Sequence, residues 1–282
     1  MAFCFGLVLV VLGVLTLPAH LAGQLSRVTI VSLGAAPVAA SPLEQFKTVP
    51  FVSLSGDSLN LPFTVAGLYS VLAVAILVVF FCFVRVTLVP SRSGVASESF
   101  YMTLLTLVRQ QVGTSAEFVF PFVAALFAFV LVLNLLGNVP YGFTVTSSLA
   151  VTLGLSVSIW FFTLFLGVSN NGLHFLAHFV PGGTPLVLVP LLVLIETVSY
   201  SARALSLGVR LFSNMLAGHT LLAILSGFLY KLVLSSVGVA LICVLPFALF
   251  VALVGLELAV SFIQAYVLVV LVSSYIRDGL PA

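Results

Sequence analysis

An arginine lies deep inside one of the longest apolar stretches of this chain. Arg210 stands within LGVRLFSNMLAGH, residues 207–219, and Glu196, Arg203 and Arg210 recur every seven residues. Seven residues are about two turns of a helix, so these three side chains share one helical face. Smaller polar residues fall within about 40° of that face: Ser199, Ser206 and Asn214. Because an arginine at the centre of a membrane helix costs roughly 2.5–3.5 kcal/mol, this polar face predicts a functional site.

The composition places the chain in a membrane. Hydrophobic residues make up 62% of it and charged residues only 6%, which is too little charge to cover a soluble globule. The net charge is +2 and Lys and Arg are not clustered, so nucleic-acid binding is not expected. Cys4, Cys82 and Cys243 sit in apolar sequence without metal-ligand spacing, and we interpret them as small buried hydrophobes outside any disulfide framework.

Residues 1–60 are expected to form an N-terminal lead-in to the membrane domain. Within it, residues 3–17 form an apolar run that is short for a span. We favour a removed or peripheral segment there, with an additional span as the alternative. Residues 24–60 combine charged residues with scattered Pro, Ser and Gly, which predicts a solvated segment.

Three apolar stretches without a charge predict ordinary spans, at residues 61–84, 118–137 and 146–167. Residues 85–113 hold several arginines and show apolar residues at helical spacing beside polar ones. This pattern predicts an amphipathic helix on the membrane surface, on the cytoplasm-like or matrix-like side. Residues 168–185 are apolar but interrupted by Gly and Pro, which predicts a re-entrant connection.

Two pairs of polar residues lie one helical turn apart in these segments. For Asn134 and Asn138, at the end of a predicted span, we favour helix capping and turn formation. For His174 and His178, in the predicted re-entrant connection, we favour a hydrogen-bonded interfacial pair. No nearby carboxylate completes a ligand set there, so no metal site is expected.

The last third of the chain is too long for ordinary spans. Residues 186–230 contain no helix-stopping sequence beyond Pro190, which predicts about 67 Å of helix across about 30 Å of hydrocarbon. A continuous helix of that length must tilt by about 60° from the membrane normal. Residues 236–276 predict a second long helix with Pro246 as a possible kink, joined to the first as an antiparallel hairpin through Lys231 and Ser235. The predicted fold class is therefore an all-α polytopic membrane protein, one domain with about five membrane-embedded helices and one surface helix.

The buried charges of this hairpin do not balance along the sequence. Glu196 and Arg203 form the one local pair, so Arg210 needs an anion from the second helix or from another polypeptide. His219 lies nine residues past Arg210, about 180° around the helix, and faces the other way. On the second helix, another polar face gathers the following residues: Glu257, Ser261, Gln264 and Tyr275.

Five segments give the chain a specific resemblance to subunit a of the rotary F-type ATP synthases, of the mitochondrial or alphaproteobacterial type. They are SPLEQF (41–46), NLLGNVPY (134–141), PGGTPLVLVPLLVLIETVSY (181–200), SLGVRLFSNMLAGH (206–219) and GLELAVSFIQAYV (255–267). The resemblance implies a proton-translocating stator subunit whose two offset half-channels face a rotor ring. Rotor subunits would be small, two-helix proteins that carry an essential carboxylate.

The same resemblance implies roles for individual residues. Arg210 matches the essential arginine that meets the rotor carboxylates, and Glu196 matches the acid of the exit path on the matrix-like side. Three residues match the path from the outer side, namely Asn214, His219 and Glu257, and Gln264 matches the neighbour that positions the arginine. Structural or modulating roles are expected for Arg203 and Tyr275, with Arg203 as a partner of Glu196.

The surroundings expected from the resemblance are a peripheral stalk, other membrane subunits of an ATP synthase, lipids and protons, in the mitochondrial inner membrane or a bacterial plasma membrane. The chain has no GxxxxGK[ST] phosphate loop, so no nucleotide site and no cofactor are expected, and ATP would be made on other subunits. The alternative function is a proton-coupled secondary transporter. Such folds usually contain two related halves, and residues 61–167 and 186–276 show no repeat.

Overall fold

The computed structural model describes residues 28–30, 44–47, 50–55, 60–83, 92–113, 116–139, 142–172, 188–235 and 244–279. Its α-helices are α2 (Val65–Phe83), α3 (Arg92–Val112), α4 (Ala116–Gly137), α5 (Leu149–Asn171), α7 (Val189–Ser235) and α9 (Val244–Gly279). Five of these, all except α3, are long and apolar enough to cross a membrane. The prediction of a polytopic helical protein with five membrane-embedded helices is therefore confirmed.

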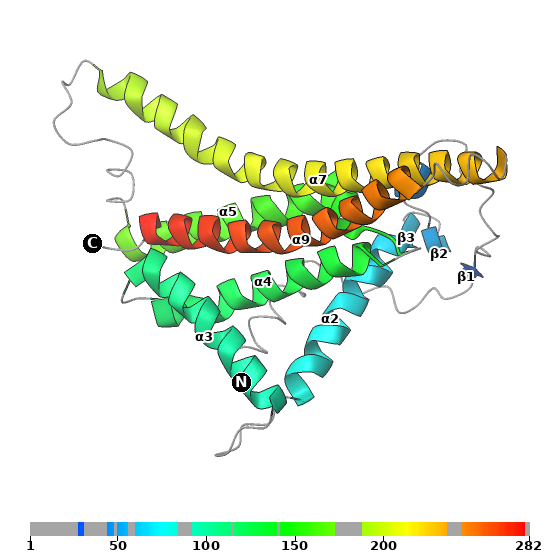
Figure 1. Ribbon diagram of the computed structural model, residues 1–282. Coiled ribbons are helices and arrows are strands. Elements are labelled where there is room, and N and C mark those ends of the chain that lie inside the picture. Colours follow the sequence, from blue (N-terminus) through cyan, green and yellow to red (C-terminus); the bar gives the residue numbers. More distant parts are fainter. Residues whose placement is uncertain are drawn as a thin grey trace.

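Four of the helices lie side by side, and α9 is central among them. Figure 1 shows α4, α5, α7 and α9 running along one another, while α2 and α3 form a V that α4 bridges. Helix α9 packs against α3, α4, α5 and α7, and α5 also packs along α7. Helices α7 and α9 run in opposite directions, as the predicted hairpin requires.

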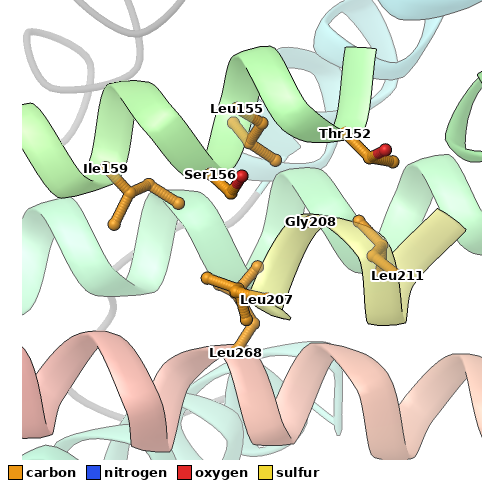
Figure 2. A pocket seen from close by; sticks show the side chains of 8 residues that line it. All are labelled: Thr152, Leu155, Ser156, Ile159, Leu207, Gly208, Leu211 and Leu268. Carbon is orange, nitrogen blue, oxygen red and sulfur yellow. The ribbon is translucent and has the colours of Figure 1, made fainter. Parts of the chain in front are cut away.

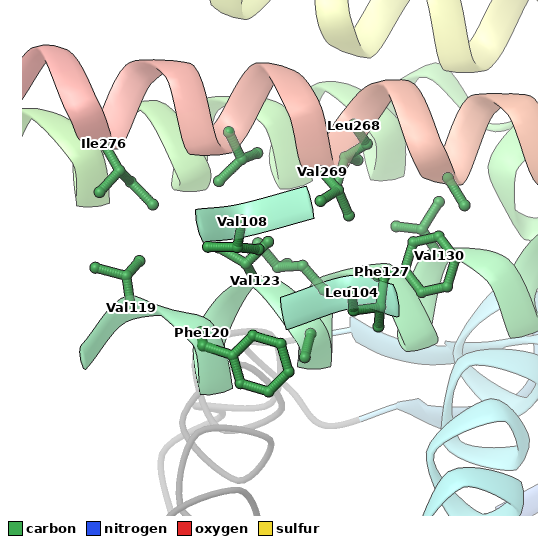
Figure 3. Packing of buried hydrophobic residues seen from close by; sticks show 14 of the residues in the cluster. Leu104, Val108, Val119, Phe120, Val123, Phe127, Val130, Leu268, Val269 and Ile276 are labelled. Atoms are coloured by element: carbon green, nitrogen blue, oxygen red, sulfur yellow. The ribbon is translucent and has the colours of Figure 1, made fainter. Parts of the chain in front are cut away.

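Helix α3 covers the core with one face and exposes the other. Leu104 and Val108 are 5% and 1% exposed. Figure 3 shows them packed among apolar side chains of α4 and α9, including Val123 and Val269. Thr103 and Thr106 lie on the exposed face, and each hydroxyl donates to the backbone carbonyl four residues earlier. The amphipathic pattern of residues 85–113 thus corresponds to a helix whose apolar stripe faces the bundle.

The two long helices differ from the predicted hairpin at their ends. Helix α7 has 47 residues, about 70 Å of helix, and continues through Lys231 to Ser235. The connection therefore falls in residues 236–243, which lie outside the described residues. Helix α9 begins at Val244, so Pro246 stands in its first turn and does not kink its interior. Proline is tolerated there because the first backbone N–H groups of a helix have no intrahelical partner.

The lead-in contains a small sheet that the sequence analysis did not predict. Strands β1 (Val28–Ile30), β2 (Pro50–Ser55) and β3 (Asn60–Thr64) pair antiparallel in that order, and a short 3₁₀ helix, η2, spans Glu44–Phe46. Helix α2 consequently begins at Val65 and not at residue 61. Pro62 disfavours helical backbone angles at Leu61, and both residues pair with β2 instead.

The remaining boundaries also shift. A 3₁₀ helix, η4 (Val145–Ser147), precedes α5, which runs to Asn171, beyond the predicted end at residue 167. Most of the predicted re-entrant connection, with His174 and His178, lies outside the described residues, as do residues 3–17.

A glycine sets the distance between α5 and α7. Figure 2 shows Gly208 of α7 opposite Ser156 and Thr152 of α5, around a cavity of about 10 Å³ that Leu268 of α9 helps to close. A Cβ atom at Gly208 would lie 2.5 Å from Ser156 Oγ and 3.0 Å from the Thr152 carbonyl oxygen. The serine can turn away, but the backbone carbonyl cannot move without the helix. Gly208 therefore permits the close approach that positions Arg210, two residues further along.

We expect Gly208→Ala to destabilise the protein by about 1–3 kcal/mol, because the added methyl group would push α7 away from α5. The thermal unfolding midpoint in detergent measures this loss. Gly227→Ala is the matched control on the same helix, where a Cβ atom would have no neighbour within 4 Å. Equal midpoints for the two variants would contradict the packing argument.

The five spans predict that Arg92 and Lys231 lie on opposite sides of the membrane. Single cysteines at these positions, in a background lacking Cys4, Cys82 and Cys243, should react with an impermeant thiol reagent from opposite sides. A cysteine at Arg277 should react from the side of Arg92. Reaction of the Arg92 and Lys231 positions from one side would refute this topology.

Candidate functional site

Helices α7 and α9 bring a histidine and a carboxylate together inside the bundle. His219 Nε2 lies 3.3 Å from Glu257 Oε1, although the residues are 38 positions apart. Their side chains are 16% and 7% exposed. Gly218 makes the approach possible, because a Cβ atom there would lie 2.8 Å from Glu257 Oε1. Two of the three residues that the resemblance assigns to the path from the outer side are thus in contact across the hairpin.

Other parts of the chain surround His219. Its Nε2 atom is 3.0 Å from the hydroxyl oxygen of Thr144, in the connection between α4 and α5. The Gln45 side chain of η2 donates to the His219 carbonyl at 3.5 Å, and the Phe46 ring meets the imidazole edge-on with centroids 6.5 Å apart. The segment SPLEQF of the lead-in thus touches this histidine.

Two asparagines connect the pair to α4, namely Asn134 within that helix and Asn138 directly after its end. Asn138 Nδ2 donates to Ser261 Oγ at 2.8 Å, and Ser261 Oγ donates to the Glu257 carbonyl at 3.0 Å. Asn134 Nδ2 reaches the Ser261 carbonyl at 3.5 Å. The interpretation of these asparagines as capping and turn residues was incomplete, since their side chains hold α4 against α9. The outer cluster is the name used for His219 and Glu257 with their polar neighbours Thr144, Asn134, Asn138 and Ser261.

A second polar cluster, called the inner cluster, lies near the start of α7 and the end of α9. Arg203 Nη2 is 3.7 Å from Glu196 Oε1, and Arg203 Nη1 is 3.8 Å from Asp278 Oδ2. Tyr200 and Tyr275 are buried there, at 9% and 7% exposure. The expected pairing of Arg203 with Glu196 is therefore observed, with a second carboxylate beside it.

Sequence reasoning missed Asp278. Asp278 follows a long apolar run and stands next to Arg277 near the end of α9, so its sequence neighbours do not indicate a partner on α7. The usable signal was the antiparallel hairpin itself, because it sets the last turns of α9 beside the first turns of α7 and leaves a carboxylate near Arg203.

Arg210 lies between the clusters on an exposed side of α7. Within the residues that the structure describes, its guanidinium group forms no ion pair or hydrogen bond. Asn214 and Gln264 are half-buried, and neither has a hydrogen bond to Arg210 in that part of the chain. The structure thus leaves Arg210 open to a group outside the described residues.

The two clusters lie on different flanks of α7. Glu196 and His219 are 23 residues apart, about 35 Å along the helix, with Arg210 between them. At about 100° per residue, Glu196 falls within about 40° of Arg210, whereas His219 is about 180° away. Arg210 therefore shares its flank of α7 with the inner cluster, whereas the outer cluster lies on the opposite flank, inside the bundle.

Comparison with known proteins gives one consistent result. The family model described as ATP synthase A chain matches residues 67–277. A protein of Mycosarcoma maydis named ATP synthase subunit a is 48% identical over 245 residues, covering 85% of this chain and 96% of that protein. Proteins of the same name from Chelativorans sp. and Chondrus crispus are 43% and 39% identical, each over 86% of this chain and 98% and 97% of their own length.

Proposed function

The chain belongs to the ATP synthase A chain family, and on this premise we propose that it is the stator subunit that conducts protons to and from a rotor ring. As subunit a of an F-type ATP synthase, it is a multi-pass protein of the inner membrane. Under the proposal, the outer and inner clusters belong to two half-channels that do not meet within this chain. The observation that carries the proposal is the position of Arg210, exposed between two polar clusters on different flanks of α7.

Arg210 acts on the rotor carboxylates under this proposal. An opposite charge within about 4–6 Å favours the ionised form of a carboxyl group, so a rotor subunit releases its proton as it approaches the guanidinium. Arginine suits this task because it stays protonated. Its charge also separates the two half-channels, since a proton moving directly between them must pass a fixed positive charge.

The outer cluster supplies protons to the rotor. His219 and Glu257 are titratable, nearly buried and 3.3 Å apart, so a proton can pass between them without a large movement of either side chain. Asn214 lies between His219 and Arg210 in the sequence of α7, and Gln264 lies two turns beyond Glu257 on α9. We place these two residues at the rotor end of this path.

The inner cluster receives protons from the rotor. Glu196 provides the exit carboxylate, and Arg203 holds it while also contacting Asp278. Because Arg203 Nη atoms lie 3.7–3.8 Å from both carboxylates, its charge is shared inside this chain, which distinguishes it from Arg210. Arg203 is therefore a structural partner of Glu196 and Asp278, and Tyr275 lies buried beside it.

The length of α7 gives the two paths their lateral offset. A helix of about 70 Å must incline steeply to remain in about 30 Å of hydrocarbon, so sites far apart along α7 lie side by side more than above one another. A proton then completes its passage only when a rotor subunit carries it from one path to the other. Each elementary charge that crosses provides about 2.3 kcal/mol per 100 mV for rotation.

We expect Arg210→Lys to abolish ATP-driven proton pumping in vesicles that contain the assembled complex. A lysine enclosed between α7 and the rotor can lose its proton and lacks the planar guanidinium group, so a fixed charge is no longer guaranteed. Arg203→Lys is the matched control on the same helix and should keep most of the pumping, because a cation remains between Glu196 and Asp278. Arg203→Gln should act mainly on stability. Near-normal pumping by assembled Arg210→Lys complexes would contradict the proposal.

We expect the exchange His219→Glu with Glu257→His to retain much of the proton flux that either single change loses. The path requires two adjacent titratable groups more than it requires their order. The measurement is a double-mutant cycle on proton flux, with a coupling of at least about twofold expected for groups in direct contact. Additive losses without rescue in the exchanged protein would show that the two residues act independently.

A further inference from the structure

One ring nitrogen of His219 has two polar neighbours. Its Nε2 atom lies 3.0 Å from Thr144 Oγ1 and 3.3 Å from Glu257 Oε1. A ring nitrogen either carries one proton and donates or is bare and accepts. An ionised carboxylate only accepts, whereas a hydroxyl group both donates and accepts. The two neighbours therefore suit opposite states of the same nitrogen atom.

The surrounding structure fixes the position of the Thr144 side chain. Thr144 is 5% exposed, and its carbonyl accepts from the Ser147 backbone N–H at 3.2 Å and from the Ser147 hydroxyl at 2.6 Å. Its methyl group packs on α4 at Gly137, where an added Cβ atom would lie 2.7 Å from Thr144 Cγ2. With the backbone and the methyl group held, the hydroxyl is directed at His219.

The carboxylate alone does not satisfy the ring in both states. Glu257 Oε1 is buried and forms no hydrogen bond of good geometry in the described part of the chain, and its closest basic atom is His219 Nε2. While Glu257 holds the proton, its O–H can donate back to the bare Nε2. Once Glu257 has passed the proton on, two buried acceptors face each other and Nε2 needs another donor, because a buried acceptor without a donor is costly. Among the described residues, the other polar and aromatic contacts of His219 are Gln45 at its backbone carbonyl and the Phe46 ring edge, and neither supplies a donor to Nε2.

We propose that Thr144 is a positioning residue for proton transfer between His219 and Glu257, with a hydroxyl group that reverses its hydrogen bond as the proton moves. This inference rests on the proposed function, in which protons pass through the outer cluster. When His219 carries protons on both ring nitrogens, Nε2–H faces the ionised carboxylate. The proton then moves from Nε2 to Glu257, leaving neutral imidazole and a neutral carboxyl group. When Glu257 releases that proton towards the rotor, the Thr144 O–H turns to donate to the bare Nε2 until the ring is protonated again, and Thr144 itself gains and loses no proton.

The test compares three variants in the assembled complex, with ATP-driven proton pumping into vesicles as the measurement. Thr144→Val keeps the branched shape and the contact with Gly137 but removes the hydroxyl, and should lower the flux about three- to tenfold, the range for one lost hydrogen bond. Thr144→Ser keeps the hydroxyl and should stay within about twofold of the unchanged protein.

Thr146→Val is the matched control. Thr146 belongs to the same short segment and is 1% exposed, and its hydroxyl has no hydrogen-bond partner among the described residues. The same substitution there removes a buried hydroxyl without touching His219, so the flux should be unchanged. If Thr144→Val does not assemble, Thr144→Ala compared with Thr144→Ser gives the same contrast.

Two outcomes separate this inference from the proposed function. If His219→Ala and Glu257→Gln leave the flux unchanged, the outer cluster conducts no protons and the proposed path fails. If both changes lower the flux but Thr144→Val behaves like Thr146→Val, the path stands and the role of Thr144 is overturned. Equal losses in Thr144→Val and Thr144→Ser would also overturn it, because the hydroxyl would then not be the group that matters.

Discussion

The structure depends on the requirement that a charge within hydrocarbon has a partner. Helix α7 carries Glu196, Arg203 and Arg210 on one flank and His219 on the other, and α9 supplies Asp278 and Glu257 to them. Removing ions from water costs several kcal/mol each, and only close opposite charges or hydrogen bonds offset that cost. The antiparallel hairpin provides such partners for the charged residues in both clusters. Arg210 is the exception, and the function proposed for the chain follows from that exception.

Close packing at glycine residues makes these pairings possible. At Gly208 the backbones of α5 and α7 approach too closely for a Cβ atom, and at Gly218 the carboxylate of Glu257 occupies the space of one. At Gly137 the methyl group of Thr144 occupies that space. Small residues let membrane helices approach each other where the hydrophobic effect between helices is weak. Each of the three glycines therefore positions a polar group as well as a helix.

Sequence periodicity was sufficient for features that lie within one helix. The seven-residue spacing of Glu196, Arg203 and Arg210, the length of α7 and the amphipathic face of α3 all follow from about 100° per residue. Contacts between helices were predictable only where the hairpin set the register, as for His219 and Glu257. The contact of Thr144 with His219 and the link from Asn138 to Ser261 depend on how the helices are rotated against one another, which no single helix encodes. The small sheet was missed because its strands are short and are separated in the sequence by charged and turn-forming residues.

The outer face of α7 combines side chains that need different surroundings. Large apolar side chains are exposed along it, including Leu205 and Val209, and Arg210 lies directly beside them. Lipid accommodates the apolar side chains but does not solvate the guanidinium group, whereas water solvates the guanidinium group but not the apolar side chains. A newly inserted chain therefore has a surface that neither solvent satisfies. In the proposed complex a rotor subunit removes this conflict, because its helices can cover the apolar side chains while its carboxylate pairs with the guanidinium group.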